Sequence, residues 1–98
     1  MTTLRLAAEL AEDFRRIAEH LAAHEVQDID ARLTEVIDAL QVLARHPLIG
    51  RPSSGGWREL VIGRDARGYV ARYRYDAPGD VVRVTALRAQ REAGFREG

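Results

Sequence analysis

The residues of this sequence with the clearest chemical potential are arginines in its second half. Six of them lie within or just after three apolar segments: Arg58, Arg72, Arg74, Arg83, Arg88 and Arg91. A guanidinium group stays protonated and binds phosphate in a bidentate way. Several that converge would bind a phosphodiester and stabilise charge that develops on it. Their spacing does not place all six on one face of a sheet.

Cleavage of RNA by attack of a 2′-hydroxyl would also need groups that transfer protons. Arginine is a poor base because it keeps its proton. The remaining candidates near the same segments are Glu59, Tyr69, Tyr73, Tyr75 and, in a loop, His46. Each tyrosine also suits ordinary packing, and each strand arginine also suits a solvated surface. The sequence leaves both interpretations open.

Metal and cofactor chemistry have little support in the sequence. His20 and His24 lie four positions apart, a spacing that can chelate a metal from one helix. No third ligand is evident, the chain has no cysteine, and its glycines form no phosphate-binding loop. We therefore expect neither a metal nor a cofactor.

The net charge of zero hides an asymmetry between the two halves of the chain. Residues 1–50 hold 5 Arg and 9 acids, whereas residues 51–98 hold 10 Arg and 6 acids, giving net charges of −4 and +4. All 15 basic residues are arginine. A basic half suits a phosphate backbone or an acidic protein segment. The base composition of a GC-rich genome is an equally good explanation of the arginine usage.

Apolar residues three or four positions apart predict two amphipathic helices, over residues 8–23 and 29–45. Asp28 is the expected N-cap of the second helix, and Pro47 forbids its continuation. Two such helices with a short connection form an antiparallel hairpin.

Short apolar segments predict strands over residues 57–62, 69–75 and 81–87, with a further edge strand at 2–6. Residues 48–56, 63–68 and 77–80 read as loop or turns, and residues 88–98 as a polar tail anchored by Phe95.

Alternation along the strands predicts which side chains share a face. Arg72 and Arg74 fall together on one face of their strand, and Val82, Val84 and Ala86 together on one face of the last strand. Short connections between these strands imply antiparallel pairing.

These elements predict an α+β fold, in which a small antiparallel sheet of three to four strands packs on an N-terminal helical hairpin. A chain of 98 residues is expected to form a single domain, 1–98. The sequence has no signal peptide and no segment long enough to cross a membrane. With the absence of cysteine, this favours a cytoplasmic protein.

Four blocks of the sequence together resemble the RelE/ParE family of bacterial type II toxins. They read HPLIGRP at 46–52, RELVI at 58–62, GYVARYR at 68–74 and ALRAQREAGF at 86–95. The resemblance covers nearly the whole chain, because the two helices also suit the family. It implies a toxin of a plasmid-stabilisation or related module, restrained by a cognate antitoxin that wraps it.

The resemblance implies one of two targets. RelE-like members cleave messenger RNA in the ribosomal A site without a metal, and ParE-like members poison DNA gyrase without catalytic residues. The clustered arginines favour a ribosome-dependent mRNA endonuclease that inhibits translation. In that role Arg58, Arg74, Arg88 and Arg91 would act on the scissile phosphate. Two further arginines would bind the nucleic acid, Arg72 and Arg83.

The terminal motif departs from the family pattern at two positions. Similar toxins often read RHQREAGY there, whereas this chain has Ala89 in place of the histidine and Phe95 in place of the tyrosine. Both changes remove groups that transfer protons, which contribute roughly 10²–10⁴-fold to a rate. Three explanations are open: a member that does not cleave RNA, a weakened toxin that only binds its antitoxin, or an engineered Ala89.

Overall fold

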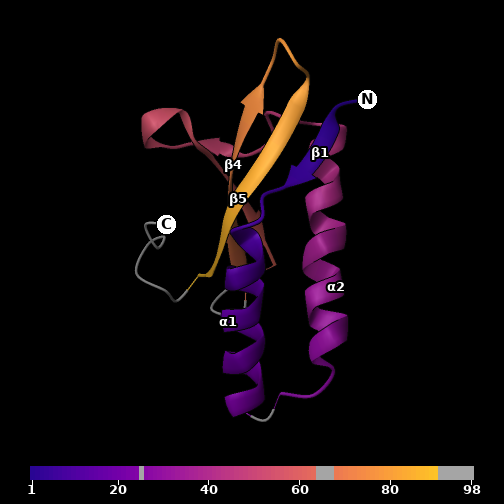
Figure 1. The fold of residues 1–98 in the computed structure, drawn as a ribbon, viewed down its shortest axis with the longest axis vertical. Helices are drawn as coiled ribbons and strands as arrows, with labels where there is room; N and C mark the ends of the chain where they lie inside the picture. The colour runs from indigo at the N-terminus through magenta and orange to yellow at the C-terminus, as the bar shows by residue number, and fades with distance from the viewer. Residues whose placement is uncertain (25, 64–67, 91–98) are drawn as a thin grey trace.

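The computed structural model describes residues 1–24, 26–63 and 68–90. Most of the predicted turn at 63–68, and both Arg91 and Phe95, lie outside the described residues. Figure 1 shows two helices side by side, with a twisted sheet rising from their upper half. The predicted α+β class is confirmed, but the sheet has five strands and is mixed rather than antiparallel.

The helical hairpin forms as its apolar periodicity predicts. Helix α1 spans Leu10–Ala23, and α2 spans Ile29–Leu40 and continues as a 3-10 turn, η1, over Gln41–Ala44. Asp28 precedes α2 in a left-handed conformation, φ 57°, and its side chain makes no capping hydrogen bond, so the prediction of an Asp28 side-chain cap is wrong. Its carbonyl instead accepts the Arg32 N–H.

The sheet has the order β1-β5-β4-β3-β2. Strand β1 spans Thr3–Leu6, β2 Arg51–Pro52, β3 Arg58–Ile62, β4 Tyr69–Asp76 and β5 Val81–Ala89. Strand β1 pairs with β5 in parallel, and the other neighbours are antiparallel. The segment predicted as a loop holds β2 and a 3-10 turn, η2, over Ser54–Gly56.

A bulge in β5 changes which side chains face the helices. Arg72 pairs with Ala86 and the next residue of β4 pairs with Val84, which leaves Thr85 without a partner. The extra residue reverses the alternation. Leu87 therefore joins the core in place of Ala86, and the predicted face of Val82, Val84 and Ala86 is wrong at Ala86.

The core lies between the helical hairpin and one face of the sheet. Its buried side chains come from both helices, η1 and the two central strands: Leu10, Ile17, Leu21, Val36, Leu40, Leu43, Ala71, Tyr73, Val82, Val84 and Leu87. The opposite face of β1, β5 and β4, here called the outer face, carries the arginines described below. No helix in the described part of the chain is long and apolar enough to cross a bilayer.

Candidate anion-binding site on the outer face of the sheet

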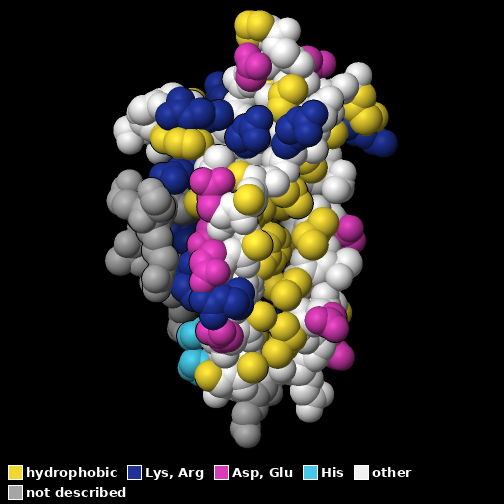
Figure 2. Space-filling model, viewed as in Figure 1, with side chains coloured by type: hydrophobic (Ala, Val, Ile, Leu, Met, Phe, Trp, Pro, Cys, Tyr) yellow, Lys and Arg dark blue, Asp and Glu magenta, His cyan; other side chains and the backbone are white. Residues whose placement is uncertain are grey.

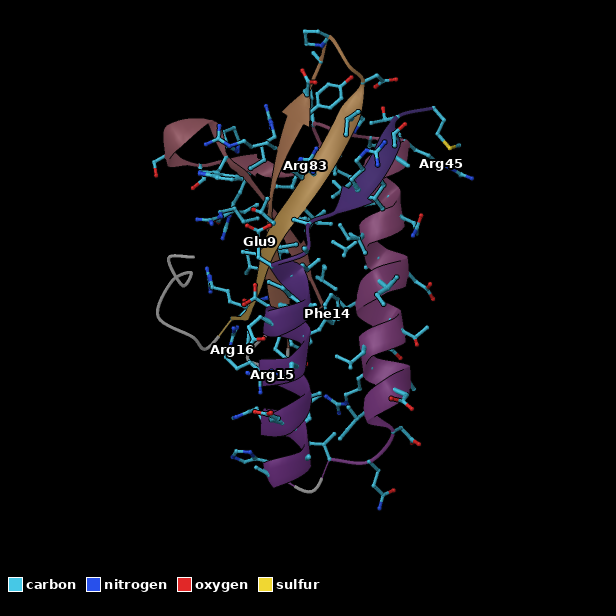
Figure 3. All side chains as sticks on the ribbon, in the orientation of Figure 1. Glu9, Phe14, Arg15, Arg16, Arg45 and Arg83 are labelled. Carbon is cyan, nitrogen blue, oxygen red and sulfur yellow. The ribbon has the colours of Figure 1, made fainter. Side chains whose placement is uncertain are left out.

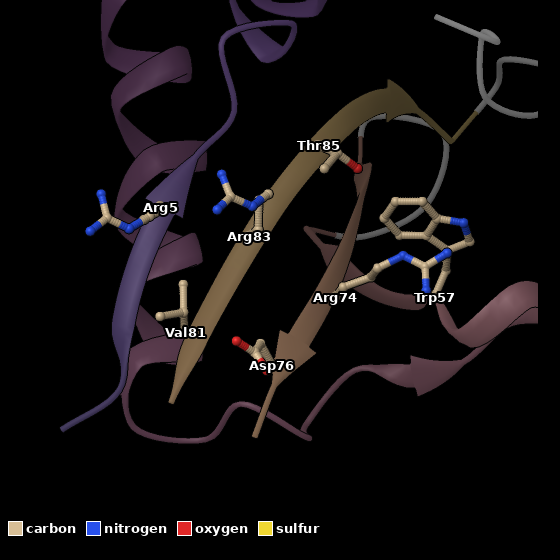
Figure 4. Close-up of a pocket in the computed structure, with 7 residues that line it drawn as sticks. All are labelled: Arg5, Trp57, Arg74, Asp76, Val81, Arg83 and Thr85. Carbon is tan, nitrogen blue, oxygen red and sulfur yellow. The ribbon is translucent and has the colours of Figure 1, made fainter. Parts of the chain in front are cut away.

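Three arginines on neighbouring strands stand in register across the outer face. Arg83 of β5 has Arg5 of β1 as its partner on one side and Arg74 of β4 on the other. We call these three residues the arginine row (Figure 4). Neighbouring strands lie only about 4.8 Å apart, and like charges placed directly opposite destabilise a sheet. Such an arrangement is explained more readily by binding an anion than by stability.

The arginine row lines a groove of about 290 Å³. The other lining residues are Trp57, Asp76, Val81 and Thr85. Within the described part of the chain, the guanidinium groups of Arg5 and Arg83 have no hydrogen bond or ion pair. Of the described residues, Asp76 is the one carboxylate that lines this groove. The groove is thus a positively charged surface whose donors are available to a ligand.

Trp57 fixes one end of the row. The Arg74 guanidinium carbon lies 3.8 Å from the Trp57 ring centroid, and that of Arg72 lies 4.4 Å from it. Both are cation–π contacts, and they confirm that the two arginines share a face. Gly56 makes room for this stacking, because a Cβ there would come within 2.9 Å of Arg74 Nη1.

An acidic helix borders the basic face. A second groove of about 680 Å³ lies between α1 and the sheet, and it is lined by Glu9, Glu12, Asp13, Arg15, Arg16, Glu19, Trp57, Arg72, Thr85 and Ala86. Figure 2 shows arginines in a band across the upper part of the molecule and acidic side chains below them. Figure 3 places Glu9 just before α1, and Arg15 and Arg16 along α1, beneath Arg83. The two grooves share Trp57 and Thr85.

The structure separates Arg58 from the arginine row. Arg58 pairs with the buried Tyr73, on the core side of the sheet. Its Nη1 donates hydrogen bonds to the carbonyls of Leu48 and Gly50, at 3.2 and 2.7 Å. The Tyr73 hydroxyl accepts the Gly50 N–H at 2.8 Å. Arg58 therefore holds the loop before β2.

The other sequence-predicted residues are spread over the outer face. Arg72, Arg74 and Arg83 lie near one another around Trp57 and the first groove. Arg88 pairs with Val70 further along β5, and its Nη1 contacts the Ala89 carbonyl at 3.4 Å.

None of the five predicted proton-transfer candidates lines the groove of the arginine row. Burial raises the pKa of the Tyr73 hydroxyl, and a hydrogen bond to Asp80 raises the pKa of Tyr75. Glu59 pairs with Arg51, with 3.0 Å between Oε1 and Nη2. Tyr69 packs against the core, and His46 lines a separate hollow beside Arg45 and Leu48.

Two features of the site were not predicted from the sequence: the place of Arg5 in the arginine row and the position of Arg58 on the core side of the sheet. Arg5 joins the row only because β1 pairs in parallel with β5, and no local pattern signals that. The placement of Arg58 did have a signal, since Arg58, Leu60 and Ile62 alternate and the last two are apolar. Among described residues, no group of three or more His, Asp or Glu side chains could hold a metal. The His20 and His24 rings contact each other at a tilt of 39°, with their centroids 4.2 Å apart.

Solved structures share this fold. The chain is similar to a protein from the chromosomal ParDE toxin–antitoxin system of P. aeruginosa, with TM-score 0.73 and 19% identity, covering 91% of this chain and 96% of the other. It is also similar to a chain of the intact E. coli RelBE toxin–antitoxin complex, with TM-score 0.55, 16% identity and coverages of 94% and 100%. The fold class is thus that of RelE/ParE-like toxins.

The sequence itself gives the family. Residues 4–94 match the family described as ParE toxin of type II toxin-antitoxin system, parDE. The chain belongs to this family of ParE toxins, and the RelE/ParE resemblance is confirmed. Among curated proteins, none matches the sequence significantly.

Proposed function

We propose that this chain is the toxin of a type II module and that it inhibits DNA gyrase by binding, without catalysing a reaction itself. Its membership of the ParE family supports this target. The observation that carries the proposal is the separation of Arg58 from Arg74. Arg58 is engaged with loop carbonyls on the core side, whereas Arg74 stacks on Trp57 on the outer face.

Catalysis of RNA cleavage needs several groups within hydrogen-bond reach of one phosphate and its nucleophile. The hydroxyls of Tyr73 and Tyr75 are hydrogen-bonded to Gly50 and Asp80, and Ala89 stands where similar toxins often have histidine. An inhibitor that works by binding needs none of these groups. The arrangement around the groove therefore favours the gyrase target over the RNA target.

Ribosome-dependent mRNA cleavage is the second candidate. It is favoured by the arginine row and its neighbour Trp57, since basic grooves with aromatic residues suit single-stranded nucleic acid. In this alternative the roles of Arg58, Arg74, Arg88 and Arg91 in catalysis, and of Arg72 and Arg83 in RNA binding, remain predictions. Both candidate targets place the protein in the cytoplasm.

The partner that restrains the toxin is proposed to be a cognate antitoxin. Figure 2 shows an apolar strip between α1 and α2 on the viewed face. Leu6 and Ile37 are exposed, and Phe14 and Leu33 are partly buried beside the core. Strand β1 is also an edge of the sheet. An antitoxin segment with an apolar face suits the strip, and an added strand suits the edge.

Purified toxin, gyrase and supercoiled plasmid test the proposed target. We expect linear plasmid to accumulate in the presence of toxin and ATP, while an mRNA on translating ribosomes stays intact. A matched Ala89→His variant should behave in the same way. Cut mRNA without linear plasmid would contradict the proposal, and cleavage by the histidine form alone would identify Ala89 as an inactivating change.

A separate binding measurement tests the antitoxin surface. Ile37→Asp should weaken antitoxin binding at least tenfold, because a charge would be buried in the apolar strip. Charge reversal at Arg74 and Arg88 should leave binding nearly unchanged. If only the charge reversals weakened binding and made it less salt-dependent, the antitoxin would lie on the basic face instead.

A further inference from the structure

We infer that the arginine row is a binding site for the phosphodiester backbone of nucleic acid, and that its physiological ligand is the DNA held by gyrase. The inference rests on the proposed function for the identity of that DNA. The site consists of Arg5, Arg83 and Arg74, with Trp57 at one end. Arg5 is part of it although it lies 69 positions or more before its two partners.

The positive charge of the arginine row and its unoccupied hydrogen-bond donors indicate that its ligand is an anion. Three guanidinium groups face one side of three adjacent strands, and those of Arg5 and Arg83 make no ion pair within the described residues. Guanidinium binds phosphate with two parallel hydrogen bonds. A bound polyanion would also remove the repulsion between neighbouring arginines, so binding and strand stability favour the same state.

The size of the site points to a backbone rather than to a single phosphate group. Two strand spacings separate Arg5 from Arg74, roughly 10 Å between their Cα positions. Besides the arginines, the polar groups that line the groove are those of Asp76, Thr85 and the Trp57 indole, and the Thr85 hydroxyl already donates to the Arg72 carbonyl at 3.5 Å, so guanidinium–phosphate contacts would dominate. Contacts of this kind position a nucleic acid without selecting its sequence. Sequence-independent binding suits a toxin that would meet DNA at any site where gyrase holds it.

Trp57 lowers the loss of side-chain conformational entropy that accompanies nucleic-acid binding. Its ring contacts the guanidinium groups of Arg74 and Arg72 before any ligand arrives. A side chain already held in place loses less conformational freedom on binding. Gly56 permits this arrangement, because a Cβ at that position would lie 2.9 Å from Arg74 Nη1.

Fluorescence anisotropy with the purified full chain tests the inference without gyrase. The probes are fluorescein-labelled duplex DNA, single-stranded DNA and RNA of one sequence. We expect duplex DNA to bind, and Arg5→Ala and Arg83→Ala each to weaken it several-fold and to lower the slope of log affinity against log salt by about one. Arg83→Lys keeps the charge and should keep the slope.

Arg45→Ala is the matched control. It removes the same charge from an exposed arginine beyond β1, which lines a different hollow (Figure 3). It should leave affinity nearly unchanged. Equal losses in Arg45→Ala and Arg83→Ala, or no loss in Arg5→Ala, would overturn the inference. Trp57 is the only tryptophan, so its emission should change on DNA binding in the unmodified chain and in the control.

The failures of the two proposals are distinguishable. If duplex DNA binds through the row but gyrase is unaffected, the proposed target is wrong and the phosphodiester site stands. If RNA binds through the row more tightly than DNA, the site again stands and the ligand is messenger RNA. In the gyrase assay, several-fold higher concentrations of the Arg5→Ala and Arg83→Ala toxins should be needed to give the same amount of linear plasmid.

Discussion

The carboxylate of Asp13 accepts a hydrogen bond of 2.9 Å from the backbone N–H of Leu87, although 74 positions separate them. Arg16 pairs with the same carboxylate at 2.6 Å and donates to the Leu87 carbonyl at 3.1 Å. Strand β1 pairs with β5 only as far as Val84. Beyond it, the Asp13 and Arg16 side chains take the place of a neighbouring strand and satisfy polar groups at the sheet edge.

Asp13→Ala should destabilise the protein by about 1–3 kcal/mol, because it leaves a partly buried backbone donor unsatisfied and Arg16 without this carboxylate. The measurement is urea unfolding followed by far-UV circular dichroism. Glu12→Ala is the control, since Glu12 pairs with Arg15 in solvent and such pairs contribute little. Equal effects of the two changes would show that the Leu87 contact adds nothing to stability.

Tyr73→Phe should cost about 1–3 kcal/mol, because the buried Gly50 N–H loses its acceptor while packing is preserved. Tyr69→Phe is a suitable control on the same strand. Gly50→Ala should be worse than either, since its Cβ would lie 2.6 Å from the Tyr73 hydroxyl and 2.8 Å from the Glu59 carbonyl. An unfolding midpoint for Tyr73→Phe identical to that of the parent would contradict the structural role of the hydroxyl.

Arg58→Ala and Arg74→Ala should have different effects, the first on stability and the second on DNA binding. Arg58→Ala should lower stability by about 1–2 kcal/mol because two carbonyls lose a charged donor. Arg74→Ala should change stability by less than about 1 kcal/mol, since it loses one cation–π contact but relieves repulsion with Arg83. It should weaken DNA binding in the anisotropy assay. The reverse pattern, with Arg58 needed only for binding, would argue for a phosphate-binding role at that position.

The stability of the folded protein should depend on pH through the carboxyl group of Asp80. Its Oδ1 accepts hydrogen bonds from the Thr2 hydroxyl at 2.7 Å and the Tyr75 hydroxyl at 2.8 Å, and these bonds lower its pKa from the ordinary 3.8. The folded-state pKa lies below the unfolded one, so the stabilisation is full above about pH 4 to 5 and is lost as the pH falls through the folded pKa.

Asp80→Asn provides the comparison for this pH dependence. Asparagine tolerates the left-handed conformation that Asp80 adopts, φ 52°, so backbone strain should not obscure the result. The difference in thermal unfolding temperature between the two proteins should shrink as the pH is lowered from about 5 to about 2. A difference that stays constant over this range would exclude the carboxylate as its source.

Much of the scaffold follows from local sequence patterns. The apolar spacing in α1 and α2 gave both helices, Pro47 set a limit to the second, and alternation in β4 placed Arg72 and Arg74 together. These patterns are local, because helical and strand periodicities follow from the geometry of neighbouring residues. The family resemblance likewise came from short blocks whose order and spacing are visible in the sequence.

The candidate site depended on the tertiary structure. Strand β1 lies beside β5 in parallel, and only this pairing brings Arg5 to Arg83. The bulge at Thr85 reversed the faces of the following residues, which periodicity alone would carry on unchanged. The sequence by itself thus determined both helices, four of the five described strands and the family, since these rest on local pattern. The fold decided which charges meet, because strand register depends on partners distant in the chain.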